Sequence, residues 1–171
     1  FFFSYLRSPF FFFFLFSFAF FRQSSWVLAK NARGILPPGD THHFHRTRRD
    51  AFNQADVIII VGTPFDFRMG YGKRLRSEAT VVQIDMDYRT VGKNRDVSLG
   101  LVGHPGAILH AVLEATTGRK DNGAGAREVW LDELRTLEAQ KTEKLMPQFL
   151  SDKSPISPYR VAWELNEFLT E

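Results

Sequence analysis

Asp56–Gly62 (DVIIIVG) is a run of five apolar, β-branched residues between an acid and a glycine. A strand with one wet face would alternate apolar and polar residues, and a buried helix would need a longer run. A short, continuously apolar segment that ends in glycine is typical of a strand buried on both faces of a parallel sheet. Because parallel strands need long crossover connections, this run predicts further strands separated by helices or long loops.

Two later segments fit that expectation. Thr80–Asp85 (TVVQID) predicts a second buried strand, and Ser98–Gly103 (SLGLVG) predicts a shorter third one. Arg46–Ala55 predicts a short helix before the first strand, and His104–Thr116 predicts a helix after the third. The alternation indicates an α/β fold, a partial doubly wound (Rossmann-like) parallel sheet with helices. Such sheets usually have more than three strands, so we expect half of this one to be missing.

The last third of the chain is expected to be helical and more polar. Thr117–Ala126 is rich in glycine and predicts a linker. A charged amphipathic helix is predicted over Arg127–Lys144, and Lys153–Pro158 predicts a break. Ser157 and Pro158 suit the cap and first turn of a closing helix that ends at Leu169. The expected apolar faces consist of Trp130, Leu134 and Leu137 in the first helix, and of Val161, Leu165 and Phe168 in the second.

The first 21 residues contain 12 of the 18 phenylalanines, and they contrast with an ordinary composition afterwards. Ser8–Phe18 contains only Phe, Leu, Ser and Pro, whose codons begin with two pyrimidines. Translation of a pyrimidine-rich non-coding stretch would produce such a peptide. The alternative is a targeting or membrane-anchor segment, although the apolar run between Arg7 and Arg22 is short for a spanning helix. We therefore separate residues 1–25 from the domain as a non-native or targeting segment.

The net charge of +3 comes from interspersed charges of both signs, which gives no support for nucleic-acid binding. The chain has no cysteine, so disulfides, thiolate zinc sites and cysteine nucleophiles are excluded. This composition suits a reducing compartment, and we expect a cytoplasmic protein with no membrane contact unless the Phe-rich segment is genuine.

Two motifs invite a functional interpretation that their context does not favour. Gly70–Arg74 (GYGKR) lacks the upstream glycine and the Ser/Thr of a phosphate-binding P-loop, which favours a turn. His42, His43 and His45 crowd together, but close histidines on a loop converge poorly on a metal without a further ligand. A surface loop is the simpler interpretation.

Asp85 is the strongest candidate for a binding residue. A carboxylate at the carboxyl end of a buried parallel strand can accept two hydrogen bonds from a ribose. An Asp that only caps its own loop is equally common there. Arg68 follows the first strand and is expected on the same edge of the sheet, where it would pair either with a phosphate or with Asp66.

Taken together, Ala55–Tyr71 (ADVIIIVGTPFDFRMGY), Val81–Arg95 (VVQIDMDYRTVGKNR) and Leu101–Leu109 (LVGHPGAIL) resemble the central domain of thiamine-diphosphate-dependent enzymes. The similarity is to the acetolactate synthase large-subunit group in particular. Ser154–Leu169 also resembles the lead-in to the C-terminal domain of that family. On this basis residues 26–117 are the second half of the central domain, and residues 118–171 lead into a missing cofactor domain.

The resemblance implies three successive α/β domains, with thiamine diphosphate and magnesium bound between the first and the third. Neither the catalytic glutamate of the first domain nor the G-D-G…N motif of the third is present in this sequence. The central domain holds FAD in acetolactate synthases and ADP in oxalyl-CoA decarboxylases. By resemblance, Asp85 and Met86 match the pair that meets the adenosine ribose, and Gly62 and Thr63 match the loop beside the nucleotide.

Two departures from the FAD-binding members bear on that expectation. Pro64 stands where they have arginine, and His104 stands where they have aspartate. The loss of one charge-assisted hydrogen bond at such a place costs about 1.5–3 kcal/mol. We therefore expect no tight flavin binding.

The resemblance implies a fragment of a carboligase or decarboxylase that acts on a 2-oxo acid, with a homodimeric or homotetrameric parent. The alternatives are a fragment of an acyl-CoA lyase or decarboxylase that binds ADP, and a non-catalytic scaffold protein. We expect the chain alone to be inactive, with no catalytic and no metal-ligating residue of its own. A sirtuin-like deacylase is disfavoured because its zinc ribbon needs cysteines.

Overall fold

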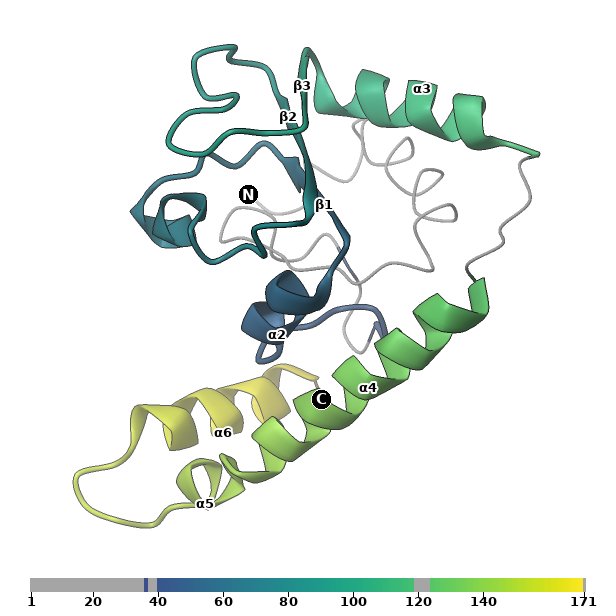
Figure 1. Ribbon diagram of the computed structural model, residues 1–171. Coiled ribbons are helices and arrows are strands. Elements are labelled where there is room, and N and C mark those ends of the chain that lie inside the picture. The colour runs from purple at the N-terminus through teal and green to yellow at the C-terminus, as the bar shows by residue number, and fades with distance from the viewer. Residues whose placement is uncertain (1–35, 37–39, 119–123, 171) are drawn as a thin grey trace.

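The computed structural model describes Leu36 and residues 40–118 and 124–170. The Phe-rich segment and the middle of the predicted linker lie outside the described residues. Figure 1 shows a small parallel sheet at one end of the structure and a group of helices at the other.

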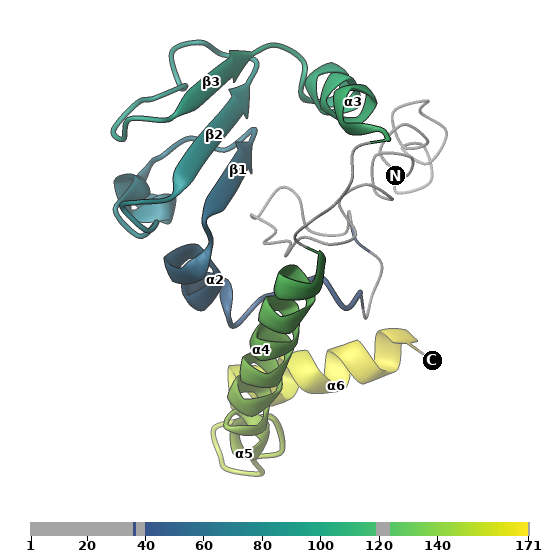
Figure 2. The ribbon, with the colours of Figure 1, turned by 45° about the vertical axis from the view of Figure 1, so that its right-hand side comes forward.

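Three parallel strands form the sheet, in the order β1 (Val57–Val61), β2 (Thr80–Asp85) and β3 (Leu99–Val102). Ile59 is paired with Val82, and Val82 is paired with Leu99. Figure 2 shows the three arrowheads pointing the same way, toward the end of the sheet from which α3 (Pro105–Thr116) departs. The α/β class and all three strands are therefore confirmed.

The two crossovers inside the sheet contain no α-helix. The first passes through η4 (Phe67–Gly72), a 3₁₀ segment, and the second is the irregular stretch 86–98. Apolar side chains from the first crossover pack under the strands and form the main core. That core consists of Ile58, Ile60, Phe65, Met69, Leu75, Ala79 and Val81.

The other face of β1 is open. Val57, Ile59 and Val61 alternate with the buried Ile58 and Ile60, and they are 58%, 42% and 37% exposed. The expectation of a strand buried on both faces is therefore wrong for β1 in the described structure, because α3 packs over β2 and leaves β1 uncovered.

A second cluster joins the amino-terminal part of the described chain to α4 (Ala124–Glu143). Leu131 and Leu134 are fully buried against Phe44 and against Ala51 of α2 (Arg48–Gln54), with Trp130 at the margin. The Trp130 indole N–H donates to Gln54 Oε1 at 2.9 Å. Helix α4 is thus packed onto the helix that leads into β1.

The predicted boundaries of α4 and its buried face need correction. The helix begins at Ala124, so the last three residues of the predicted linker are helical. Alanine is the strongest helix former, and the sequence Ala-Gly-Ala lengthens a helix that packing already holds in place. Leu131 is buried in place of Leu137, which is only half-buried.

The closing helices pair with each other. Phe149 of α5 (Met146–Phe149) stacks on Trp163 of α6 (Pro158–Thr170), with ring centroids 5.3 Å apart. The amide of Tyr159 donates to the Ser157 hydroxyl at 3.2 Å, which confirms the predicted cap. Val161, Leu165 and Phe168, which form the predicted apolar face of α6, are exposed.

Candidate functional site

The carboxyl ends of the three strands lie side by side and form one edge. The amide of Gly62 donates to the carbonyl of Ile84 at 2.9 Å, and the amide of Gly103 donates to the carbonyl of Asp85 at 3.0 Å. These bonds continue the parallel ladder one residue past β1 and β3. In open α/β sheets, ligands bind outside this carboxyl edge.

Gly62 ends β1 in a left-handed conformation, with φ of +59°. A side chain at this position would meet no atom within 4 Å, so glycine is required by the backbone and not by a neighbour. The backbone next to Thr63 is therefore open to approach. The hydroxyl of Thr63 donates to the carbonyl of Val61 at 3.4 Å.

Asp85 ends β2 and is half-buried. Its Oδ1 accepts a hydrogen bond from the amide of Asp87 at 2.9 Å, so the loop-capping role that the sequence left open is present. No second hydrogen bond reaches this carboxylate from the described residues. Its neighbour Met86 is 67% exposed.

Sequence reasoning missed the residue that links the two loops of this edge. Gln83 lies in β2 and is fully buried. Its Nε2 donates to the carbonyl of Thr63 at 3.3 Å, and its Oε1 accepts from the amide of Gly92 at 2.9 Å. A polar residue inside TVVQID was the available signal, because a buried amide has to find partners.

The loop after β2 is fastened at two further points that the sequence did not single out. Asn94, with φ of +69°, donates through Nδ2 to the carbonyl of Phe65 at 2.9 Å. The guanidinium of Arg95 donates to the carbonyls of Gly72, Leu75 and Arg76 at 2.7–3.2 Å. Both side chains hold the second crossover against the first.

Arg68 pairs with Asp66, which is one of the two partners that the sequence left open for it. Its guanidinium and its amide both bind the carboxylate of Asp66, which keeps the pKa of Asp66 below its ordinary value. The next residue, Met69, accepts a contact from Arg48 of α2.

A second Asp-aromatic-Arg turn follows β2. Arg89 binds Asp87 through its amide at 3.0 Å and through its guanidinium, and this pairing keeps the pKa of Asp87 below its ordinary value. The ring between them, Tyr88, is exposed. The cation closest in sequence to Asp85 is thus already neutralised.

His104 precedes α3, where its backbone is extended and Pro105 opens the first turn. A side chain at Gly106 would lie 3.1 Å from Cε1 of His104, so the imidazole lies against the backbone of the first turn. The third strand therefore contributes an imidazole, and not a carboxylate, to this edge.

The two remaining motifs have structural roles. Gly70, Tyr71 and Gly72 all have positive φ values, and Gly72 packs against the Arg95 side chain, which confirms a turn in place of a P-loop. The rings of His43 and His45 lie 3.9 Å apart. Over residues 40–118 and 124–170, no group of three His, Asp or Glu side chains is arranged to hold a metal.

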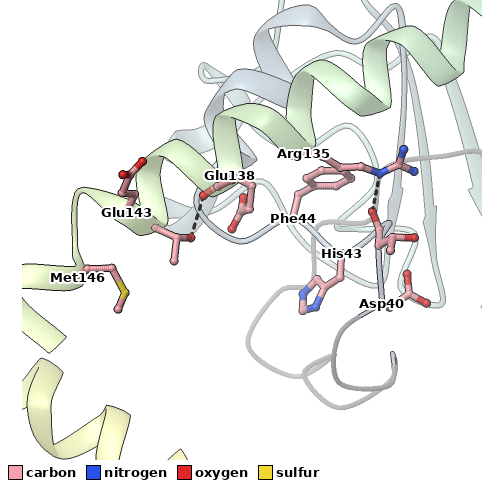
Figure 3. Close-up of a pocket in the computed structure, with 10 residues that line it drawn as sticks. Asp40, His43, Phe44, Arg135, Glu138, Glu143 and Met146 are labelled. Atoms are coloured by element: carbon pink, nitrogen blue, oxygen red, sulfur yellow. Dashed lines mark hydrogen bonds between the residues drawn. The ribbon is translucent and has the colours of Figure 1, made fainter. Parts of the chain in front are cut away.

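A depression of about 530 Å³ lies far from the carboxyl edge, between the loop around Phe44 and α4 (Figure 3). Two of its charged groups, Arg135 and Glu138, are already engaged. Arg135 pairs with Glu128 and Asp132, and its Nε donates to the carbonyl of Thr41. Glu138 accepts hydrogen bonds from the backbone before α2. We therefore assign the candidate site to the carboxyl edge and not to this depression.

The three parallel strands and the helices beside them define an α/β domain. Residues 26–112 match the family described as "thiamine pyrophosphate enzyme, central domain". The chain belongs to this family.

The curated relatives include three kinds of enzyme. A probable acetolactate synthase of Mycobacterium bovis is 33% identical over 138 residues, which are 81% of this chain and 24% of the relative. A 2-hydroxyacyl-CoA lyase 2 of Xenopus laevis is 31% identical over 78% of this chain and 22% of its own length. An oxalyl-CoA decarboxylase of Escherichia coli is 24% identical over 82% of this chain and 24% of its own length. The chain thus spans about a quarter of these relatives.

Within the described ranges, no helix is long and apolar enough to cross a membrane.

Proposed function

We propose that the carboxyl edge binds the adenosine part of a nucleotide, with Asp85 accepting hydrogen bonds from the ribose. The observation that carries this proposal is the half-buried Asp85 carboxylate beside the open backbone of Gly62. A carboxylate at a strand end and a glycine that admits a ligand are the two features that nucleotide-binding α/β sheets use. Met86 supplies an apolar contact next to the ribose.

The edge offers few charges to a diphosphate. Pro64 has no side-chain donor, and Arg68 and Arg89 are paired with Asp66 and Asp87. Charge-assisted bonds contribute about 1.5–3 kcal/mol each, so their scarcity weakens the binding of the diphosphate that ADP and FAD both contain. The adenosine part, which the two nucleotides share, is the part that this edge recognises.

We further propose that the complete protein is a carboligase or decarboxylase that acts on a 2-oxo acid and assembles as a homodimer or homotetramer. The 33% identity to a probable acetolactate synthase favours this over the acyl-CoA lyase alternative. Thiamine diphosphate supplies a carbanion equivalent when bound. We assign neither it nor magnesium to this chain, because the sequence has no Gly-Asp-Gly motif and the described residues form no metal cluster.

Calorimetric titration of the 171-residue chain tests the nucleotide proposal. We expect ADP to bind, FAD to show no submicromolar affinity, and uridine diphosphate to bind more weakly than ADP. Equal affinities for ADP and uridine diphosphate would contradict adenosine recognition. An assay with pyruvate, thiamine diphosphate and magnesium is expected to show no turnover by the chain alone, and clear turnover would overturn that assignment.

A further inference from the structure

We infer that Gln83 is a positioning residue, which holds the two loops of the nucleotide edge at a fixed separation. This inference rests on the proposed function, because it concerns how the same site is shaped. Gln83 does not reach the edge itself. It acts through Thr63 on one side and through Gly92 on the other.

The side-chain amide of Gln83 has both hydrogen-bonding ends in use. Its donor end bonds to a carbonyl of the first crossover at 3.3 Å, and its acceptor end bonds to an amide of the second at 2.9 Å. The side chain of Gln83 is fully buried, and its partners Thr63 and Gly92 are half-buried. An apolar residue would leave a carbonyl and an amide unpaired, and each such group costs free energy when buried.

The two partners are close in sequence to the candidate ligand contacts. Thr63 directly follows Gly62, whose backbone is open to a ligand. Gly92 belongs to the loop that starts with Asp85, Met86 and Asp87. Gln83 is bonded to both loops. A substitution at Gln83 therefore changes the positions of the two loops without replacing any residue that contacts the ligand.

Two variants separate the two halves of this link. Gln83→Glu keeps an oxygen that accepts from Gly92, but it places a second oxygen against the Thr63 carbonyl. Gln83→Met has a similar length and loses both bonds. Gln140→Glu is the matched control, since Gln140 is exposed on α4.

The readouts are amide hydrogen exchange and ADP affinity, both measured well below the unfolding temperature. We expect the Gly92 amide to stay protected in Gln83→Glu and to lose protection in Gln83→Met. ADP affinity should fall about tenfold in both, which corresponds to one buried hydrogen bond. Unchanged ADP affinity in both variants, or equal loss of protection across the whole domain, would overturn the positioning role.

A measurement on the unmodified chain keeps the inference testable if a variant does not fold. The side-chain amide protons of Gln83 should exchange with water far more slowly than those of the exposed Gln140 and Gln148. Equally fast exchange would contradict the link. If the unmodified chain binds no ADP while Gln83 and Gly92 are protected, the proposed function fails and the link between the loops stands.

Discussion

Glu138 of α4 caps the start of α2. Its Oε2 accepts hydrogen bonds from both the amide and the hydroxyl of Thr47, at 2.9 and 2.7 Å, although Thr47 lies 91 positions earlier in the chain. The amides of Arg46 and His45 donate to the same carboxylate. The first N–H groups of a helix have no partner inside it, and its positive end favours an acid. Thr47, the N-cap residue of α2, makes no side-chain bond to the first turn, and its own amide and hydroxyl are bound by Glu138.

The first prediction concerns the stability that this cap provides. Gln at position 138 keeps the shape and one acceptor but loses the charge. Glu138→Gln should therefore lower the free energy of unfolding by about 1–3 kcal/mol, the range for a hydrogen-bonded charged group. Urea unfolding measures this. Glu133→Gln, an exposed position on the same helix, should change stability by less than about 0.5 kcal/mol. Equal effects of the two substitutions would contradict the capping role.

The second prediction concerns pH. Burial raises the pKa of Glu138, but hydrogen bonds from Thr47 and from the amides of Arg46 and Thr47 outweigh burial, so the net pKa lies below the ordinary 4.5. A lowered folded-state pKa stabilises the fold above the unfolded-state value, and this stability is lost as pH falls through the folded-state pKa. The difference in stability between the natural chain and Glu138→Gln should thus be constant near neutral pH and shrink below about pH 4.5. Unfolding curves across that range measure it, and a difference that grows toward acid would contradict the assignment.

The regular elements could be predicted because their signals are local. The apolar run Asp56–Gly62, the strand TVVQID and Pro105 before an apolar helix each determine an element within a few residues. The packing of α4 could not be predicted this way. Leu131 is buried by Phe44 and Ala51, at least 80 positions away, and no local pattern indicates those partners.

The candidate site was predictable only in part, for the same reason. Gly62 and Asp85 end their strands, so the sheet alone brings them together. For Arg68 the sequence left a phosphate and Asp66 open as partners, and the structure shows the pair with Asp66. Gln83, Asn94 and Arg95 bond to backbone groups 9–29 positions away, and such bonds leave no periodic pattern in a sequence.

The third prediction uses the glycine at the end of β1. Gly62→Ala forces a Cβ into a left-handed conformation without a clash, since nothing lies within 4 Å. It should destabilise the chain by about 1–2 kcal/mol. Gly125→Ala is the control, because Gly125 lies in α4 with equal space and no positive φ, and alanine there should be neutral or stabilising. Thermal unfolding of the two variants measures the difference, and a stabilised Gly62→Ala would refute the backbone argument.

The fourth prediction tests the link between the crossovers. Arg95→Met removes donors to three carbonyls and should cost roughly 2–4 kcal/mol, at or above the range for bonds from a charged group. Lys93→Met, two positions earlier and exposed, should change stability little. Chemical denaturation compares the two variants. Similar losses of stability would indicate that the charge in this loop matters and that the bonds to the carbonyls do not.

The fifth prediction concerns the proposed ribose contact. Asp85→Asn keeps an oxygen for the Asp87 amide, so loop structure and stability should be retained. It removes the charge offered to the ribose, and ADP affinity should fall about tenfold, the equivalent of one charge-assisted bond. Calorimetry on both proteins measures the change. Unchanged affinity would exclude Asp85 as the contact.

The most direct test of a nucleotide site at the carboxyl edge is an amide chemical-shift map of the chain during titration with ADP. We expect the perturbed amides to cluster at this edge, at Gly62, Thr63, Met86 and Gly103, and we expect Asp85→Asn to weaken their response. Perturbations confined to the depression beside α4, or none at saturating ADP, would contradict a nucleotide site at this edge.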